Sequence, residues 1–294
     1  MKHDPIIAWP IRLAVLAGAI LIVWTPARAE TPSLSAAQVV AKNVAARGGL
    51  AAWQRVHTLA FVGKIDAGKT HPEPAGTIDN PVPPLTKRRV AEAALRGTTP
   101  APTSTVIALP YRIEMKRPRK VRIELEFAGQ RAVQTYDGTV GWTLRPYLGH
   151  TSPEPFSAVE LKVAADQQDL DGLLIDSASK GSTVAMEGVD PVEGHRAYKL
   201  KVTLRNGDVR RVWVDASTFL DIKVDGRRPV GARYRTMVTT LGDYRSIDGV
   251  MIPFLMETTG EGLKGSEKIV VEKATVNADL PDSRFTKPQP AGAG

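Results

Sequence analysis

The chain has 294 residues, of which 43% are hydrophobic and 24% are charged, and its formal net charge at pH 7 is +8. This composition is typical of a folded globular protein and excludes disordered and fibrous classes. The complete lack of cysteine excludes a disulfide scaffold, thiolate chemistry and a lipid-modified N-terminal cysteine.

The first 29 residues have the pattern of a secretory signal peptide. Basic residues precede an apolar run over residues 13–24, and Ala27-Arg28-Ala29 supplies the small-x-small pattern that signal peptidase accepts. The run is shorter than the ~20 residues that a membrane-spanning helix needs, which makes a retained anchor the less favoured alternative. We therefore expect residues 1–29 to be removed during export, so that the mature chain begins at Glu30 and works outside the cytoplasm.

The start of the mature chain predicts two helices and a strand. Ser35 and Gln38 have the spacing of a capping box, and the helix that they open is expected to end at Gly48-Gly49. A second, short helical segment is expected over residues 50–56. From Thr58 onward apolar residues alternate with small or polar ones, which indicates a β-strand.

Residues 66–104 interrupt these patterns. Proline recurs through the segment, as in His71-Pro72-Glu73-Pro74, and no apolar period is sustained. We expect an irregular surface insertion here. The chain ends in a Pro/Gly/Ala-rich stretch, residues 287–294, which is expected to be a flexible tail. The remainder, residues 30–286, is predicted to form one domain around the insertion.

Beyond the insertion the sequence predicts short strands joined by turns. Residues 120–127 alternate strictly, while residues 158–177 predict one or two helices. Asp137-Gly138 and Asn206-Gly207 predict type I′ hairpin turns, and Asp248-Gly249 predicts a third turn. Further strands are expected over residues 183–189, 197–204, 209–214, 219–224, 251–258 and 269–276. Since few strand–helix–strand crossovers are visible, the sheet should be antiparallel with helices on one side.

The hairpin at Asn206-Gly207 bears on how this sheet is covered. If these two residues form the whole turn, Leu200 faces Trp213, and Val212 points to the opposite side of the sheet. Both faces are then partly apolar. Three arrangements explain such a hairpin: helices cover one face and enclose a cavity, a partner covers the outer face, or the protein's own loops bury both faces.

Patterns that indicate an enzyme or a metal site are missing from the sequence. The five histidines are scattered without zinc-ligand spacing, and no Gly-x-Ser-x-Gly elbow occurs. Gly260 to Gly265 matches the dinucleotide-binding string, but the residues that follow alternate as a strand, which predicts a hairpin loop. Asp169 and Asp171 are better explained by helix capping than by calcium binding. We therefore expect no enzymatic activity, no cofactor and no metal.

Residues 116–122 form the densest basic stretch, Lys-Arg-Pro-Arg-Lys-Val-Arg. Two explanations stay open for it: a site for phosphate or lipid head groups, or lysines and arginines that keep an edge strand from pairing with other chains. For Arg227-Arg228 we favour edge protection. Export makes nucleic acid an improbable partner.

Three blocks of sequence resemble a known family in their order and spacing. They are residues 116–123 followed by Tyr136-Asp-Gly-Thr-Val-Gly-Trp142, residues 194–221, and residues 243–253. Together they resemble the outer-membrane lipoprotein-sorting family, the superfamily of LolA-like periplasmic lipoprotein carriers with its lipid-carrier and envelope-stress-sensor relatives. The insertion at residues 66–104 departs from the family's pattern.

The resemblance implies a mainly β (α+β) fold: a strongly twisted antiparallel sheet that forms an incomplete β-barrel, with helices plugging the open side. It implies a non-enzymatic periplasmic carrier, which holds a lipid or the acyl chains of a lipoprotein in an apolar cavity for lipoprotein sorting or lipid transport to the outer membrane. A membrane-bound donor or acceptor protein is implied as a partner, and we expect a monomer. The alternative is an envelope-stress sensor or regulatory binding protein with the same fold.

The resemblance also suggests candidate site residues. Arg117 and Arg119, beside the proline-containing turn, are the candidates for contact with an anionic group or a membrane partner. For the apolar candidates, ordinary core packing is the competing explanation. The candidate residues lining the lipid cavity are Leu59, Phe61, Ile123, Leu125, Trp142, Leu200, Val202, Trp213, Leu255 and Met256.

Overall fold

The computed structural model describes residues 34–70, 105–167, 169–230, 233–261 and 265–289. The predicted signal peptide, most of the predicted insertion and the end of the predicted tail lie outside these residues. The helices are α1 (Ala36–Ala46), α2 (Leu50–Gln54) and α4 (Ala158–Gln167), with 3-10 turns η1 (Pro146–Leu148) and η2 (Asp282–Phe285). The strands are β1 (Thr58–Thr70), β2 (Thr105–Lys116), β3 (Lys120–Phe127), β4 (Gln130–Tyr136), β5 (Gly141–Arg145), β6 (His150–Pro155), β7 (Thr183–Val192), β8 (His195–Thr203), β9 (Val209–Asp215), β10 (Asp221–Val230), β11 (Arg233–Ile247), β12 (Val250–Gly260) and β13 (Glu267–Val276).

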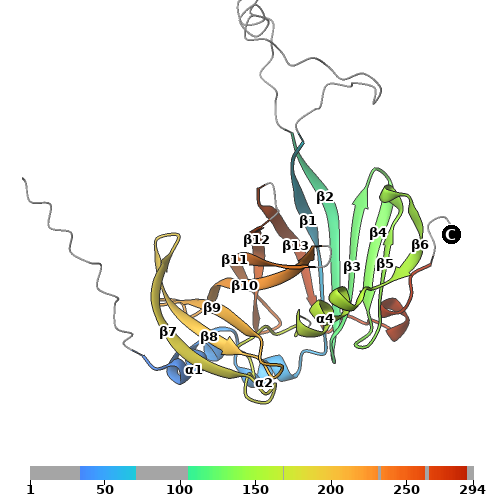
Figure 1. The fold of residues 1–294 in the computed structure, drawn as a ribbon. Coiled ribbons are helices and arrows are strands. Elements are labelled where there is room, and N and C mark those ends of the chain that lie inside the picture. Colours follow the sequence, from blue (N-terminus) through green and yellow to red (C-terminus); the bar gives the residue numbers. More distant parts are fainter. Residues whose placement is uncertain (1–33, 71–104, 168, 231–232, 262–264, 290–294) are drawn as a thin grey trace, which may run out of the picture.

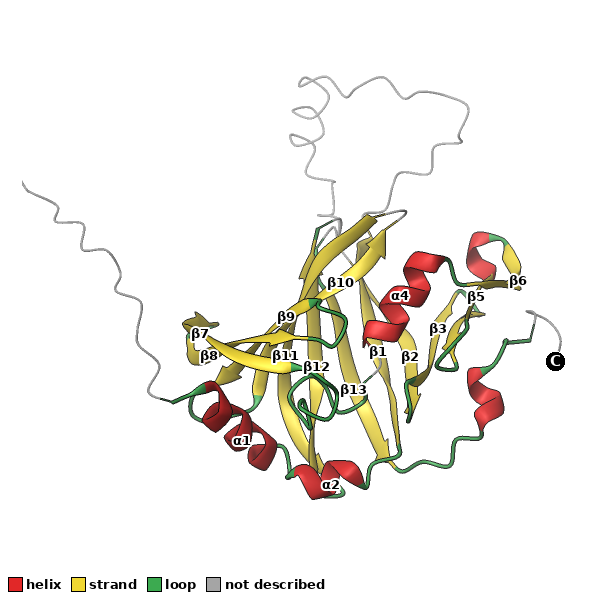
Figure 2. Cartoon of the chain, turned by 60° about the horizontal axis from the view of Figure 1, so that its bottom comes forward, coloured by secondary structure: helices red, strands yellow, loops and turns green. Residues whose placement is uncertain are grey.

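All the described strands belong to one antiparallel sheet, as expected from the lack of crossovers. Their order is β6-β5-β4-β3-β2-β1-β13-β12-β11-β10-β9-β8-β7. Each described strand thus pairs with strands consecutive to it in sequence, except that β1 also pairs with β13. The sheet curves from β7 on one side to β6 on the other without closing (Figures 1 and 2). The fold is therefore mainly β, with an open and strongly curved sheet.

The local predictions for the N-terminal elements are confirmed. Ser35 and Gln38 form the capping box of α1, with the Ser35 side chain accepting from the Gln38 N–H and the Gln38 side chain accepting from the Ser35 N–H. β1 starts at Thr58 but continues to Thr70, further than its apolar pattern indicated, because it pairs with β2 over residues 105–116. Strand pairing thus extends into the segment that we expected to be irregular from residue 66.

The predicted register of the Asn206-Gly207 hairpin is wrong by one residue. Leu200 pairs with Val212, and the Leu204 N–H donates to Asp208 O, so the turn between these two residues holds three residues. Of Asn206 and Gly207, Gly207 alone has a positive φ, +85°. A slip of one residue moves every side chain on one strand to the other face. The apolar residues of β8 and β9 therefore share one face, and Trp213 lies on the other.

The other two predicted turns differ from each other. Asp248 and Gly249 both have positive φ, +48° and +84°, and join Ile247 directly to Val250, as a two-residue turn requires. Asp137 does not have positive φ, and the β4–β5 turn is longer. The Asp137 carboxylate instead accepts the N–H groups of Thr139 and Val140, both at 2.8 Å, and so caps a four-residue turn.

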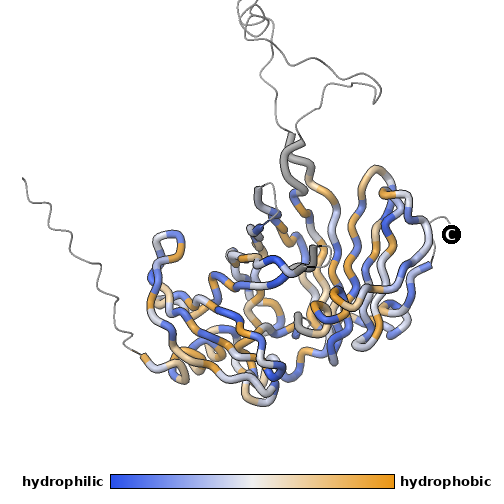
Figure 3. Tube along the Cα trace, in the orientation of Figure 1, coloured by the Kyte–Doolittle hydropathy of each residue, from blue (hydrophilic) through white to orange (hydrophobic). Residues whose placement is uncertain are grey.

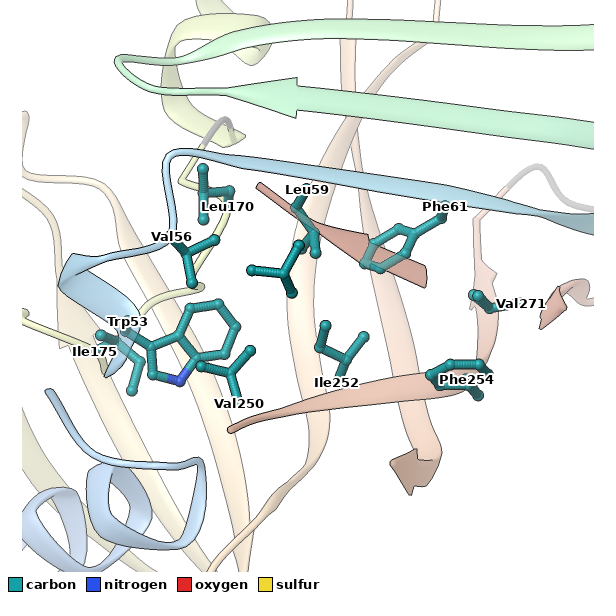
Figure 4. Close-up of a cluster of buried hydrophobic side chains, with 11 residues drawn as sticks. Trp53, Val56, Leu59, Phe61, Leu170, Ile175, Val250, Ile252, Phe254 and Val271 are labelled. Atoms are coloured by element: carbon teal, nitrogen blue, oxygen red, sulfur yellow. The ribbon is translucent and has the colours of Figure 1, made fainter. Parts of the chain in front are cut away.

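The concave face of the sheet carries the apolar core. Apolar and polar residues alternate along most strands (Figure 3), and the apolar side chains turn inward to meet the helices and residues 169–181, a run of turns that we call the covering segment. One core cluster joins Trp53 of α2 to β1, β12 and β13, together with Leu170 and Ile175 of the covering segment (Figure 4). A second joins Val39 of α1 and Leu174 to β8 and β9. One or two helices were predicted over residues 158–177. The structure has one, α4, which ends at Gln167, and the covering segment takes up the rest of that range.

The C-terminal residues run along the convex face of β2, β3 and β4. Phe285 is fully buried there, and the Arg284 guanidinium contacts the buried Glu114 carboxylate at 2.6 Å. Lys116 and Lys120 both contact Asp282, at 2.8 and 2.7 Å. These lysines of the basic stretch therefore fasten the C-terminal segment to the sheet.

The two edge strands are each interrupted. β6 holds Pro153 and Pro155, which lack a backbone N–H, and β7 has a β-bulge between Met186 and Gly188, where Gly188 has a φ of +151°. Pro191 follows in the same strand. Among the helices of the described residues, none is both long and apolar enough to cross a membrane.

One turn gives a pH-dependent prediction. Burial opposes ionisation of Asp215, but hydrogen bonds from the side chains and backbone N–H groups of Ser217 and Thr218 outweigh it and lower the pKa of Asp215 to about 2. A carboxyl whose pKa is lowered on folding stabilises the fold above its unfolded pKa, and that contribution is lost as the pH falls through its folded pKa.

We expect Asp215→Asn to lower the free energy of unfolding at pH 7 by about 1–2 kcal/mol. The difference from the parent protein should shrink as the pH falls from about 4 and vanish near pH 2. Urea unfolding followed by tryptophan fluorescence at several pH values measures this. A difference that stays constant over that range would contradict the assignment.

Candidate ligand-binding groove

A groove of about 700 Å³ opens on the concave face of the sheet. One wall is formed by β3, β4 and β5, the other by the outer halves of β10, β11 and β13, and α4 lies across it, in contact with both β5 and β10 (Figure 2). Its apolar lining comes from Val121, Ile123, Leu125, Tyr147, Phe156, Val163, Ala164, Met237 and Ile269. Elements far apart in the sequence thus build one apolar surface.

Local chemistry explains how the wall and α4 meet. Residues 121, 123 and 125 of β3 all point toward the groove. Gly141 of β5 lets the ring of Phe156 pack against that strand, because a Cβ at this position would collide with the ring. Ser157 precedes α4, and its hydroxyl accepts the Glu160 N–H and contacts the Glu160 carboxylate. Among residues 158–165 of α4, Ala164 is the buried one, and it packs against Val121 and Tyr136.

The charged groups at the border of the groove are paired. Arg145 of β5 contacts Glu160 of α4 at 3.3 Å, and Arg227 of β10 contacts Asp208 at 3.2 Å. The hydroxyls of Thr239 and Thr258 on the opposite wall lie 2.9 Å apart. A lining that combines apolar side chains with polar and charged groups suits an amphiphilic ligand, whose apolar part is removed from water while its head contacts the polar groups.

A second, smaller pocket of about 200 Å³ lies deeper on the same face. Leu59, Phe61 and Ile252 supply its apolar lining, and Arg47 and Asp221 lie at its polar end. The Arg47 guanidinium contacts the Asp221 carboxylate at 3.3 Å, and both side chains are buried. Burial raises the pKa of Asp221, whereas Arg47 and the Asn43 amide favour its ionised form.

Asp171 holds the covering segment in place. Its carboxylate contacts Arg117 at 2.7 Å and Lys180 at 2.6 Å, and its carbonyl oxygen accepts from Arg47 at 2.8 Å. The sequence suggested that Asp171 caps a helix, and the structure gives it a different role. Instead it joins α1, the β2–β3 turn and the covering segment, while its side chain is only 3% exposed.

Arg117, one of the two candidates for an anionic contact, is occupied within the protein. Besides Asp171 it contacts the carbonyl oxygens of Val56 and Trp53, at 2.9 and 3.3 Å. Arg119 is exposed, has a φ of +78° and borders a separate cleft of about 340 Å³ beside Lys180. Neither arginine borders the groove.

The predicted lining residues divide by sheet face. Ile123 and Leu125 line the groove, while Leu59 and Phe61 line the inner pocket as members of the first core cluster, against which Met256 packs. Leu200 and Val202 are fully buried in the second cluster, where Val39 and Leu174 fill the space over them. They are core residues rather than groove residues.

Three of the predicted residues lie on the opposite face. Trp142 is in register with Thr135, whose hydroxyl contacts the C-terminal segment, and the Lys287 ammonium lies 4.7 Å from the Trp142 ring centroid. Trp213 lies between Lys199 and Lys223, at 5.5 and 4.5 Å from its ring. Leu255 pairs with Val270, which is exposed on the outer face. Leu255 and Met256 are adjacent in β12, so only one of the two can face the core.

Sequence reasoning missed the groove residues of Phe156, α4, β11 and β13. The apolar period over 158–177 indicated a helix, and the alternation over 269–276 indicated a strand. Neither pattern showed that Val163 and Ile269 line the same groove. Within the described residues, no group of three or more histidine, aspartate or glutamate side chains is placed to hold a metal ion.

Comparison with known proteins finds similarity in structure but not in sequence. No protein-family model and no curated protein matches the chain. A LolA superfamily protein from Nitrosomonas europaea is 15% identical with a TM-score of 0.48, covering 87% of this chain and 99% of that one. A DUF1329 family protein from Desulfovibrio piger is 13% identical with a TM-score of 0.49, covering 85% and 97%.

A third structure, a putative outer membrane lipoprotein-sorting protein domain from Vibrio parahaemolyticus, is 12% identical with a TM-score of 0.47 and covers 84% of this chain and 94% of its own. The first and the third of these structures bear the names LolA superfamily and lipoprotein-sorting protein. At this identity the similarity concerns the fold, and residue roles do not carry over.

Removal of the Asp171 carboxylate gives a stability test. Asp171→Ala leaves Arg117 and Lys180 without their buried partner, and we expect a loss of about 3–5 kcal/mol in the free energy of unfolding. The control is Glu272→Ala, which removes an exposed partner of Lys64 and should cost no more than about 1 kcal/mol. Urea unfolding measures both, and equal effects would contradict the clamping role of Asp171.

Proposed function

We propose that this protein is a periplasmic carrier that binds the acyl chains of a lipid or lipoprotein in the groove, for lipoprotein sorting or lipid transport to the outer membrane. The observation that carries the proposal is the groove itself. Its volume of about 700 Å³ lies within the usual range for ligand sites, roughly 300–1,000 Å³, and its lining combines apolar side chains from both walls with polar and charged ones. The signal-peptide pattern of residues 1–29 supports export to the periplasm.

The energetics of lipid transfer favour an apolar groove of this size. Each buried CH₂ contributes about 0.8 kcal/mol, so burying an ordinary acyl chain must offset a transfer free energy on the order of 10 kcal/mol if the chain is to cross water. Val121, Ile123 and Leu125 on one wall and Ile269 on the other offer apolar surface over several strands. The protein supplies binding alone in this proposal, without a reaction, and works as a single chain.

We also propose that helices close the open side of the curved sheet. α4 lies over the groove, while α2 and the covering segment fill the deeper part of the concave face with Trp53, Leu170 and Ile175. Within residues 158–165 of α4, whose burial the structure describes, Ala164 alone is buried. The deep contacts are therefore those of a core, and the groove beneath α4 is the part left for a ligand.

Native mass spectrometry tests the proposal directly. Mature protein purified from an envelope fraction without detergent should carry a lipid adduct of one stoichiometry, and lipid analysis of its organic extract should identify the class. Its protein mass should correspond to a chain that begins at Glu30. A ligand-free mass, together with no uptake of offered phospholipid, would overturn the carrier proposal.

A groove-filling substitution locates the site. Val163 lines the groove on α4, so Val163→Trp should fill part of it and weaken binding of a fluorescent fatty acid by at least about tenfold. Ala158→Trp is the matched control, since Ala158 is exposed at the start of the same helix. It should bind like the parent protein. Equal binding by both variants would place the ligand outside the groove.

A further inference from the structure

Large apolar side chains are exposed along the rim of the groove. Phe127 at the end of β3 is 40% exposed, and Leu148 in η1 is 59% exposed. The Phe127 and Tyr147 rings meet edge to face with centroids 5.7 Å apart, and Tyr147 also lines the groove. An apolar rim patch of Phe127, Tyr147 and Leu148 is thus continuous with the groove lining.

The opposite side of the rim carries an exposed aromatic residue as well. Tyr234 of β11 is 37% exposed, and the Lys162 ammonium of α4 lies 5.9 Å from its ring centroid. The hairpin of β10 and β11 supplies this side of the groove through Arg227 and Met237. Exposed tyrosines and a phenylalanine therefore flank the groove on both of its walls.

The β10–β11 hairpin is also strongly basic. Residues 227–235 include four arginines, Arg227, Arg228, Arg233 and Arg235, and residues 226–242 contain no aspartate or glutamate. Arg227 contacts Asp208, and Arg235 lies 3.9 Å from Glu261. The net positive charge of this hairpin agrees in sign with that of the whole chain, +8.

We propose that the rim of the groove docks on the surface of an anionic phospholipid bilayer. Tyrosine, phenylalanine and leucine side chains partition into the interfacial region of a bilayer, and arginine is attracted to its phosphate groups. Tyr147 of the rim patch and Arg227 of the hairpin both line the groove, so docking there brings the opening to the lipid. This inference rests on the proposed function and deepens it, because it names the surface from which the groove receives its ligand.

Flotation with protein-free vesicles tests the docking. The mature protein should float with vesicles of phosphatidylglycerol mixed with phosphatidylcholine and not with phosphatidylcholine alone, and added salt should weaken the binding. Leu148→Asp places a charge in the rim patch and should weaken vesicle binding by at least about tenfold. No flotation of the parent protein would overturn the proposal and point to a protein partner at the rim.

Leu50→Asp is the matched control for this variant. Leu50 is also exposed, at 38%, and it belongs to α2, which lies far from β5 and β6, the strands that η1 joins, in both views of the fold (Figures 1 and 2). It should float like the parent protein, and equal losses for the two variants would contradict docking through the rim. Both side chains are exposed, so both variants should fold.

Two further measurements separate this proposal from the carrier function. Leu148→Asp should still bind a fluorescent fatty acid in solution, whereas Val163→Trp should lose that binding and still float with anionic vesicles. If Val163→Trp binds fatty acid normally while Leu148→Asp fails to float, docking holds and the groove assignment fails. If fatty-acid binding is lost only in Val163→Trp and flotation is unchanged in Leu148→Asp, the groove assignment holds and docking at the rim is overturned.

Discussion

Asp171 holds together parts of the chain that the sheet alone does not connect. A buried carboxylate is costly unless it is paired, and here the cations come from the β2–β3 turn and from the covering segment itself, while α1 donates to the Asp171 carbonyl. These contacts fix the covering segment over the concave face. Its apolar residues then complete both core clusters, Leu170 and Ile175 in one and Leu174 in the other. The Asp171 side chain ties the β2–β3 turn to the covering segment, and its carbonyl oxygen ties the end of α1 to the same segment.

The groove exists because this covering is uneven. The curved antiparallel sheet presents more concave surface than the three described helices and the covering segment can fill. The covering segment packs over the half of the sheet that includes β8, β9, β1 and β12. In the part of the chain that the structure describes, α4 covers the surface over β3, β4 and β5, and Ala164 is the one buried side chain among residues 158–165. Apolar side chains such as Ile123 are consequently left facing open space rather than a packed neighbour.

Local signals predicted the local structure well. The capping box at Ser35, the bounds of β3 and the Asp248-Gly249 turn all depend on chemistry within a few residues. Faces of the sheet were harder, because one extra residue in a turn reverses them: the β8–β9 loop takes in Arg205, and Trp213 consequently faces outward with two lysines. The groove could not be derived at all, since it depends on how far α4 stands from strands that are distant in the sequence. The β11 strand was missed because its apolar alternation is interrupted at Asp243, which has a positive φ of +48° within the strand.

The interrupted edge strands have a consequence for behaviour at high concentration. An open sheet with two free edges offers rows of unpaired backbone groups, and a protein that also exposes apolar side chains has two routes to self-association. The prolines of β6 remove donors along one edge, and the bulge at Gly188 twists the other away from straight pairing. Copies of the chain are thereby discouraged from joining edge to edge into fibres. The apolar groove can remain open to a small ligand without committing the protein to polymerisation.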